Sequence, residues 1–264
     1  MVGCASISTH TPVPQASADI VQPRGMNNVR YWGDAVPFDV KDRADEAITA
    51  MKARLTPNQL SKQRKEIAII ALSGGGENGA YGAGLLKGWT ERGNRPVFQA
   101  VSGVSTGALI APFAFLGSDY DDRLEAAYTQ TDASNIYKRP LIPNFLRGRS
   151  LAKSTPLKAM IAQFITPDVI DAIAREHRKG RRLNILTTNL DAGRPVVWDM
   201  GAIANQGGPE ALDLFRQVTL ASAAIPALLP PVEIEVNHNG NTYTELHADG
   251  SITSNVYAYP PQIQ

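Results

Sequence analysis

Short runs of consecutive apolar residues alternate along this chain with longer segments whose apolar residues recur at helical spacing. Runs rich in β-branched residues are typical of strands buried in a sheet, whereas a spacing of three and four residues is typical of helices with one buried face. The pattern predicts strands at 66–72, 97–102, 183–189, 194–198, 232–236 and 242–247. It predicts helices at 79–92, 106–116, 119–130, 155–164, 167–179 and 209–221, and two helical pieces within 41–63 that are interrupted at Pro57.

Alternating strands and helices predict an α/β fold with a mainly parallel central sheet and helices on both sides. The chain has 264 residues, of which 43% are hydrophobic and 19% charged, so it can bury a large core in one domain. We assign residues 41–264 to this domain and residues 1–40 to a flexible N-terminal tail.

The formal net charge of +1 and the lack of zinc-finger, Walker or basic-helix patterns give no indication of a nucleic-acid partner. No apolar run approaches the roughly 18 residues of a membrane-spanning helix.

The single cysteine, Cys4, precedes a stretch rich in Ser, Thr, Pro and Ala, which resembles the lipid-attachment junction of a bacterial lipoprotein. No charged and apolar leader precedes it in this sequence. Two localisations therefore stay open: a membrane-anchored lipoprotein or periplasmic protein, and a cytoplasmic protein with a free thiol in its tail.

The pentapeptide Gly103-Val104-Ser105-Thr106-Gly107 lies between a predicted strand and a predicted helix. The pattern G-x-S-x-G in this context is a nucleophile elbow, a sharp turn that exposes the serine hydroxyl at the end of a strand. Gly103 and Gly107 would allow the strand and the helix to approach closely. Ser105 is therefore the candidate nucleophile.

A second glycine-rich turn, Ser73-Gly74-Gly75-Gly76-Glu77-Asn78-Gly79, follows the strand predicted at 66–72. Successive glycines leave backbone N–H groups uncovered and able to bind an anion. Gly74, Gly76 and Gly79 also satisfy the dinucleotide fingerprint G-x-G-x-x-G, but no carboxylate closes the next strand to hold a ribose. We therefore favour an oxyanion hole formed by Gly74, Gly75 and Gly76.

A nucleophilic serine needs a base, and the chain has only four histidines: His10, His177, His238 and His247. Asp191 with His238 or His247 would formally complete a triad, but nothing in the surrounding sequence supports that choice. We interpret His177 as a cation near a helix C-terminus and His238 as part of a hairpin turn. Asp249, which ends a predicted strand before Gly250, is the better candidate base.

These motifs together resemble the patatin-like phospholipase family, in the family's order from about residue 67 to residue 251. Ser73–Gly79 is similar to its oxyanion motif, Gly103–Gly107 to its nucleophile motif and Asp249-Gly250 to its Asp-Gly motif. Ala221–Pro226, followed by Pro230-Pro231, is similar to a segment that those proteins carry between the last two.

The resemblance implies a three-layer α/β/α domain that cleaves lipid acyl esters through a Ser105–Asp249 dyad, with no metal or other cofactor. Two features depart from the family pattern. Asn78 stands where many members have a basic residue, and only fifteen residues follow Asp249. The second departure predicts a C-terminally incomplete fold with exposed apolar surface.

Other functions are also compatible with the sequence. A catalytically silent protein of this fold would bind a lipid or a protein partner without turnover. The segment 138–149 mixes cations with Leu, Ile and Phe, so Phe145 and Leu146 are candidates for a peripheral membrane contact, against an ordinary loop that folds onto the core. The sequence does not indicate an oligomeric state.

Overall fold

The computed structural model describes residues 10–56, 67–129 and 154–258. The helices of these residues are α1 (Val40–Lys52), α3 (Gly79–Glu91), α4 (Thr106–Leu116), α5 (Asp121–Thr129), α7 (Thr155–Phe164), α8 (Pro167–Arg178), α9 (Met200–Gln206) and α10 (Gly208–Ser222). The strands are β1 (Gln22–Pro23), β2 (Arg30–Trp32), β3 (Ile69–Leu72), β4 (Ala100–Val104), β5 (Arg182–Asn189), β6 (Arg194–Asp199), β7 (Val232–His238) and β8 (Asn241–Asp249). Short 3₁₀ turns occur at Gln15–Ser17, Gly76–Asn78, Ser118–Tyr120 and Gly250–Ile252.

All eight strands belong to one sheet, and most of its pairings are antiparallel. Only the pairs β3–β4 and β4–β5 are parallel. The expected α/β fold is therefore present, but the prediction of a mainly parallel sheet is wrong. The physical reason is the length of the connections: β5 to β6 and β7 to β8 are joined by tight turns, which return a chain only antiparallel to itself.

Strand β5 organises the sheet because it changes partner along its length. Its first half pairs with β4, up to the pair Val104–Leu186. The next residue, Thr187, pairs with Asp249 of β8. The end of β4 and the end of β8 therefore meet at the same point beside β5.

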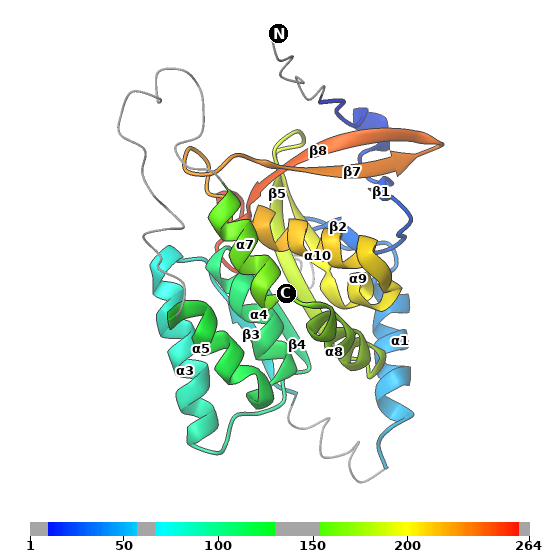
Figure 1. The fold of residues 1–264 in the computed structure, drawn as a ribbon. Helices are drawn as coiled ribbons and strands as arrows, with labels where there is room; N and C mark the ends of the chain where they lie inside the picture. The colour runs from blue at the N-terminus through cyan, green and yellow to red at the C-terminus, as the bar shows by residue number, and fades with distance from the viewer. Residues whose placement is uncertain (1–9, 57–66, 130–153, 259–264) are drawn as a thin grey trace, which may run out of the picture.

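Most of the described helices pack on one face of the sheet and form the main hydrophobic core with it (Figure 1). The opposite face carries a smaller cluster of Val104, Leu186, Val197 and Tyr257. Tyr31 packs against this cluster, and the guanidinium of Arg43 in α1 lies 5.4 Å from the Tyr31 ring centroid. Among the described residues, this second layer consists of α1 and the segment after β8, so it is thinner than the layer formed by the other helices.

Residues 10–39, part of the segment 1–40 that we expected to be a flexible tail, contribute two short strands to the sheet. β1 pairs with β7, and β2 pairs with β6. Arg30 of β2 forms a buried, bidentate ion pair with Glu245 of β8. A buried charge needs its partner, so this contact fixes the N-terminal segment to the sheet.

The predicted helices and strands agree with the observed elements to within a few residues, apart from α9, β1 and β2, which the pattern did not predict. Three predictions concern residues outside the described ranges: the second helical piece of 41–63, the segment 138–149 with Phe145 and Leu146, and Cys4. None of the described helices combines the length and the apolar character that crossing a bilayer requires.

Candidate active site

Ser105 forms the sharp turn between β4 and α4, as the G-x-S-x-G pattern predicts. Its backbone has φ 54° and ψ −123°, a conformation that L residues rarely adopt and that costs about 1–3 kcal/mol. A Cβ on Gly103 would overlap the carbonyl of Gly107, and a Cβ on Gly107 would overlap the carbonyl of Leu72. Both glycines are therefore required for the close packing of α4 against β3 and β4.

The Ser105 hydroxyl donates a hydrogen bond of 2.6 Å to Oδ2 of Asp249. Both side chains are almost fully buried. The contact follows from the partner change of β5, which places Asp249 directly after the end of β4. Gly250 allows this junction, because a Cβ there would approach the Leu186 carbonyl too closely.

The second carboxylate oxygen of Asp249 is held by Ser251, which the sequence analysis did not identify. The Ser251 N–H donates to Oδ1 at 2.8 Å and its hydroxyl donates to the same atom at 2.6 Å. These bonds fix the carboxylate plane, so that Oδ2 faces the Ser105 hydroxyl. The position of Ser251 directly after Asp249-Gly250 was a signal for this contact.

A second serine, Ser222, fixes the backbone of the nucleophile. The N–H of Ser105 donates to Oγ of Ser222 at 3.0 Å, and that hydroxyl donates to the carbonyl of Leu186 at 2.7 Å. Ser222 is fully buried at the end of α10. It belongs to the segment Ala221–Pro226 whose similarity to the family was noted, but no local pattern indicates this role.

The glycine turn after β3 lies beside the elbow. A Cβ on Gly74 would be 3.2 Å from the Cβ of Ser105, and the N–H of Gly74 donates to the carbonyl of Asn255 at 3.0 Å. Gly74 is therefore needed for close approach, and its N–H is occupied. This corrects the expectation that all three glycines are oxyanion donors.

Gly75 and Gly76 keep their N–H groups free of any acceptor within the described residues. Gly76 has φ 56°, in the region that favours glycine. The N–H of Thr106 is a further donor, because it is the first residue of α4 and has no acceptor one turn earlier in the helix. These donors suit an oxyanion.

Gly79, the first residue of α3, lies in close contact with the first turn of α4. A Cβ there would overlap the hydroxyl of Thr106 and lie 2.7 Å from the hydroxyl of Tyr128. Thr106 and Tyr128 share a hydrogen bond of 3.0 Å. Gly79 therefore allows α3 to pack against the first turn of α4.

His247 lies in a buried polar chain rather than beside the nucleophile. Its Nδ1 is 2.9 Å from Oγ1 of Thr187, and its Nε2 is 3.1 Å from Oε2 of Glu245. The indole N–H of Trp198 donates to Oγ1 of Thr187 at 2.8 Å. With both ring nitrogens engaged, His247 has no free nitrogen for Ser105.

The pKa values of His247 and Glu245 follow from burial and charge. Burial lowers the pKa of His247, and this outweighs the opposing effect of Glu245. Burial also opposes ionisation of Glu245, but the hydrogen bond from His247 and the charge of Arg30 outweigh it and lower the pKa of Glu245 to about 2. These two shifts favour a neutral His247 imidazole that donates from Nε2 to an ionised Glu245.

Within the described parts of the chain, none of the other three histidines forms a hydrogen bond with Ser105. His10 lies 2.8 Å from Asp191, whose other oxygen accepts from the N–H of Leu246. His238 ends β7 at a tight turn, as expected. His177 lies near the end of α8, 3.6 Å from Asp199, but burial lowers its pKa, so it is not the helix-end cation that we expected.

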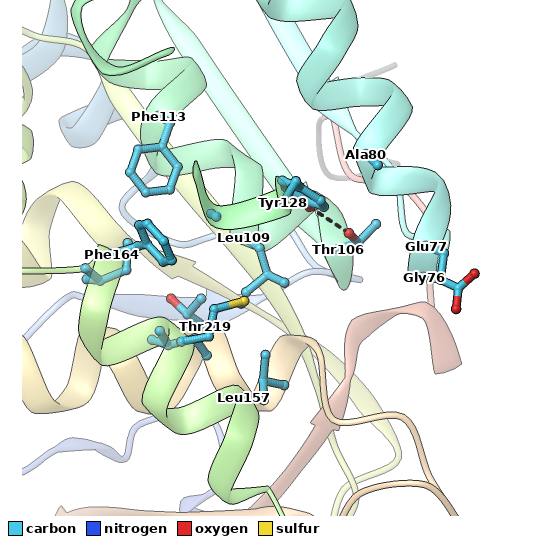
Figure 2. Close-up of a pocket in the computed structure, with 14 residues that line it drawn as sticks. Gly76, Glu77, Ala80, Thr106, Leu109, Phe113, Tyr128, Leu157, Phe164 and Thr219 are labelled. Atoms are coloured by element: carbon cyan, nitrogen blue, oxygen red, sulfur yellow. Dashed lines mark hydrogen bonds between the residues drawn. The ribbon is translucent and has the colours of Figure 1, made fainter. Parts of the chain in front are cut away.

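A cavity of about 290 Å³ opens next to the elbow and the glycine turn. Gly76, Glu77 and Thr106 lie at one end of it, and its walls come from α3, α4, α5, α7 and α10 (Figure 2). Apolar side chains provide most of the lining. Ser105 and Asp249 do not line this cavity themselves, but Thr106, which directly follows Ser105, does. The dyad is therefore adjacent in the chain to an apolar space that suits the hydrocarbon part of an ester.

Known proteins resemble the chain in sequence and in fold. A sequence profile described as Patatin-like phospholipase matches residues 70–260. No curated protein matches the chain. The crystal structure of VipD from Legionella pneumophila matches with a TM-score of 0.51 and 15% sequence identity, over 74% of this chain and 47% of that one. The chain thus spans about half the length of VipD, and a likeness at this identity shows a shared fold alone.

Proposed function

Because the chain belongs to the patatin-like phospholipase family, whose members hydrolyse lipid esters, we propose that it is a serine lipid acyl hydrolase with a Ser105–Asp249 dyad. The hydrogen bond of 2.6 Å between the two side chains carries this proposal. The apolar cavity beside them supports an ester of a fatty acid as the substrate.

In the first step, Asp249 accepts the proton of the Ser105 hydroxyl while Oγ attacks the ester carbonyl carbon. The N–H groups of Gly75, Gly76 and Thr106 stabilise the negative charge on the carbonyl oxygen. The C–O bond to the alcohol then breaks, the alcohol takes the proton, and the acyl group remains on Ser105.

In the second step, a water molecule loses a proton to Asp249 and attacks the acyl-enzyme carbonyl. The bond to Ser105 breaks, its oxygen regains the proton, and the fatty acid leaves. Ser251 and Ser222 hold Asp249 and the Ser105 backbone in place during both steps. No metal or other cofactor takes part.

The test combines Ser105→Ala and Asp249→Asn with His238→Asn as a control outside the dyad. We expect kcat on p-nitrophenyl butyrate to fall by at least about a thousandfold in the two dyad variants, since removing a nucleophile or its base has an effect of this order. Fluorophosphonate labelling should be lost in Ser105→Ala and strongly slowed in Asp249→Asn, with circular dichroism unchanged. His238→Asn should keep full activity.

A fully active Asp249→Asn would refute the dyad, and loss of activity in His238→Asn would revive a histidine triad. A folded wild-type protein that neither reacts with the fluorophosphonate nor hydrolyses any ester would support the catalytically silent, lipid- or partner-binding alternative.

A further inference from the structure

The cavity beside Ser105 has one open end and one closed end. Glu77 and Ala80, at the end next to the glycine turn, are exposed. Phe113 and Phe164, which lie at the other end, are buried. Figure 2 shows Phe113 and Phe164 on the side opposite to Gly76 and Glu77. A ligand that enters beside Gly76 and Thr106 therefore meets buried aromatic side chains at the far side of the cavity.

One face of α4 runs along the whole cavity. Thr106, Leu109 and Phe113 all line it, at the spacing of residues that share a helix face. Phe113 lies seven positions after Thr106, which corresponds to about 10 Å along the helix axis. The cavity depth from Thr106 to Phe113 is therefore of this order.

The polar side chains on the buried part of the lining are already hydrogen bonded within the protein. Thr106 and Tyr128 bond to each other, and Thr219 donates to the carbonyl of Phe215 at 2.8 Å. Among the described residues, none of the buried side-chain atoms that lack a partner lies on the lining. The cavity thus offers a mainly hydrocarbon surface, with its described hydroxyl groups already engaged within the protein.

We propose that this cavity selects the length of the acyl chain and accepts at most about eight to ten carbons; the inference rests on the proposed hydrolase function. A fully extended chain advances roughly 1.2 Å per bond, so about 10 Å accommodates roughly eight bonds. Phe113 is the residue that sets the limit.

The first experiment measures kcat/KM of the wild-type protein on p-nitrophenyl esters from C2 to C16, each below its critical micelle concentration. Each buried methylene should raise kcat/KM by about fourfold up to C8 or C10. Longer chains should give no further gain and then a loss. A flat profile, or an optimum at C14 or C16, would overturn the length limit and leave the hydrolase proposal intact.

Two substitutions in α4 should move the optimum in opposite directions. Phe113→Leu shortens the side chain at the closed end and should shift the optimum to longer esters by about two carbons. Leu109→Phe fills the middle of the cavity and should shift the optimum to C4 or C6. Unshifted optima in both variants would contradict the proposal that α4 side chains limit the acyl-chain length.

Phe115→Leu is the matched control. Phe115 is as buried as Phe113 and belongs to the same helix, but it contacts Arg181 and does not line the cavity. This variant should lose stability to a similar extent and keep the wild-type length profile. If the length profile shifts as far as in Phe113→Leu, a general loss of core packing, rather than the side chain at the closed end, determines which acyl-chain length is preferred.

Ser105→Ala separates the two proposals because it keeps the cavity and removes the nucleophile. Calorimetry should show that this variant binds octanoate and decanoate at least tenfold more tightly than butyrate, with no further gain for palmitate. If the wild-type protein hydrolyses no ester, this order of affinities still supports the length limit while the hydrolase proposal fails. Equal or increasing affinity up to palmitate would overturn the limit.

Discussion

Ser222→Ala tests whether the backbone of the nucleophile must be held by a side chain from another element. The substitution removes the only recorded acceptor of the Ser105 N–H among the described residues and the donor to the Leu186 carbonyl. An unsatisfied buried N–H costs about 1–3 kcal/mol. We therefore expect the free energy of unfolding to fall by this amount.

The effect on activity should exceed what lower stability alone explains. Ser105 occupies a strained backbone conformation, and without Ser222 its N–H can turn towards another acceptor and displace the hydroxyl from Asp249. A misplacement of about 1 Å in a reacting group can lower the rate by about a hundredfold. We expect kcat to fall by about 10- to 100-fold with KM within threefold of wild type.

The assay is steady-state hydrolysis of p-nitrophenyl butyrate at a temperature where all variants are folded, together with the rate of fluorophosphonate labelling. Ser102→Ala is the control, because Ser102 is also buried on this part of the sheet and donates to a backbone carbonyl, that of Tyr257. It should lose stability without losing kcat. If Ser222→Ala keeps at least half of wild-type kcat, or Ser102→Ala loses as much, the positioning role is wrong.

Two further predictions concern the fold around the site. Gly103→Ala should destabilise the protein by more than about 3 kcal/mol, because its Cβ would overlap the backbone of α4. Gly84→Ala is the control: Gly84 lies on the exposed side of α3 with open space around it, so this variant should be neutral or more stable by up to about 1 kcal/mol. Urea unfolding measures the free energy of unfolding of both variants. If the two variants unfold at the same urea concentration, the close approach of β4 and α4 is not required. The depressed pKa of Glu245, about 2 against an ordinary 4.5, contributes stability above pH 4.5 that is lost as pH falls towards 2. Glu245→Gln removes the charge that pairs with Arg30 and should lower the free energy of unfolding by about 3–5 kcal/mol at pH 7. Between pH 4.5 and 2, the stability of this variant should fall less than that of wild type. An equal fall in both proteins would contradict a depressed pKa of Glu245.

Local pattern was sufficient for the elements and for the motifs within them. The strand before Ser73, the elbow at Ser105 and the helix after it were all predicted, because apolar spacing and glycine placement act within a few residues. Asp249 was also identified, since its position before Gly250 at a strand end is a local feature. The resemblance to the family then assigned these residues to one site.

Tertiary structure decided which side chains touch. The partner change of β5 at Leu186 and Thr187 brings Asp249 to Ser105, and no local rule predicts pairing over such separations. Other long-range contacts are equally invisible in the local pattern. They include the antiparallel pairings of β1, β2, β6 and β7, the Arg30–Glu245 ion pair, the bond from the Gly74 N–H to Asn255 and the two partners of the His247 ring.

The amino-acid sequence by itself therefore determined the chemical groups, the turns that present them and the family. The fold decided their partners, because long-range pairing and burial depend on the summed packing of all elements rather than on any one segment. Ser222 illustrates the difference: its segment was visible in the sequence, but its contact with the Ser105 N–H exists only because α10 ends against β5.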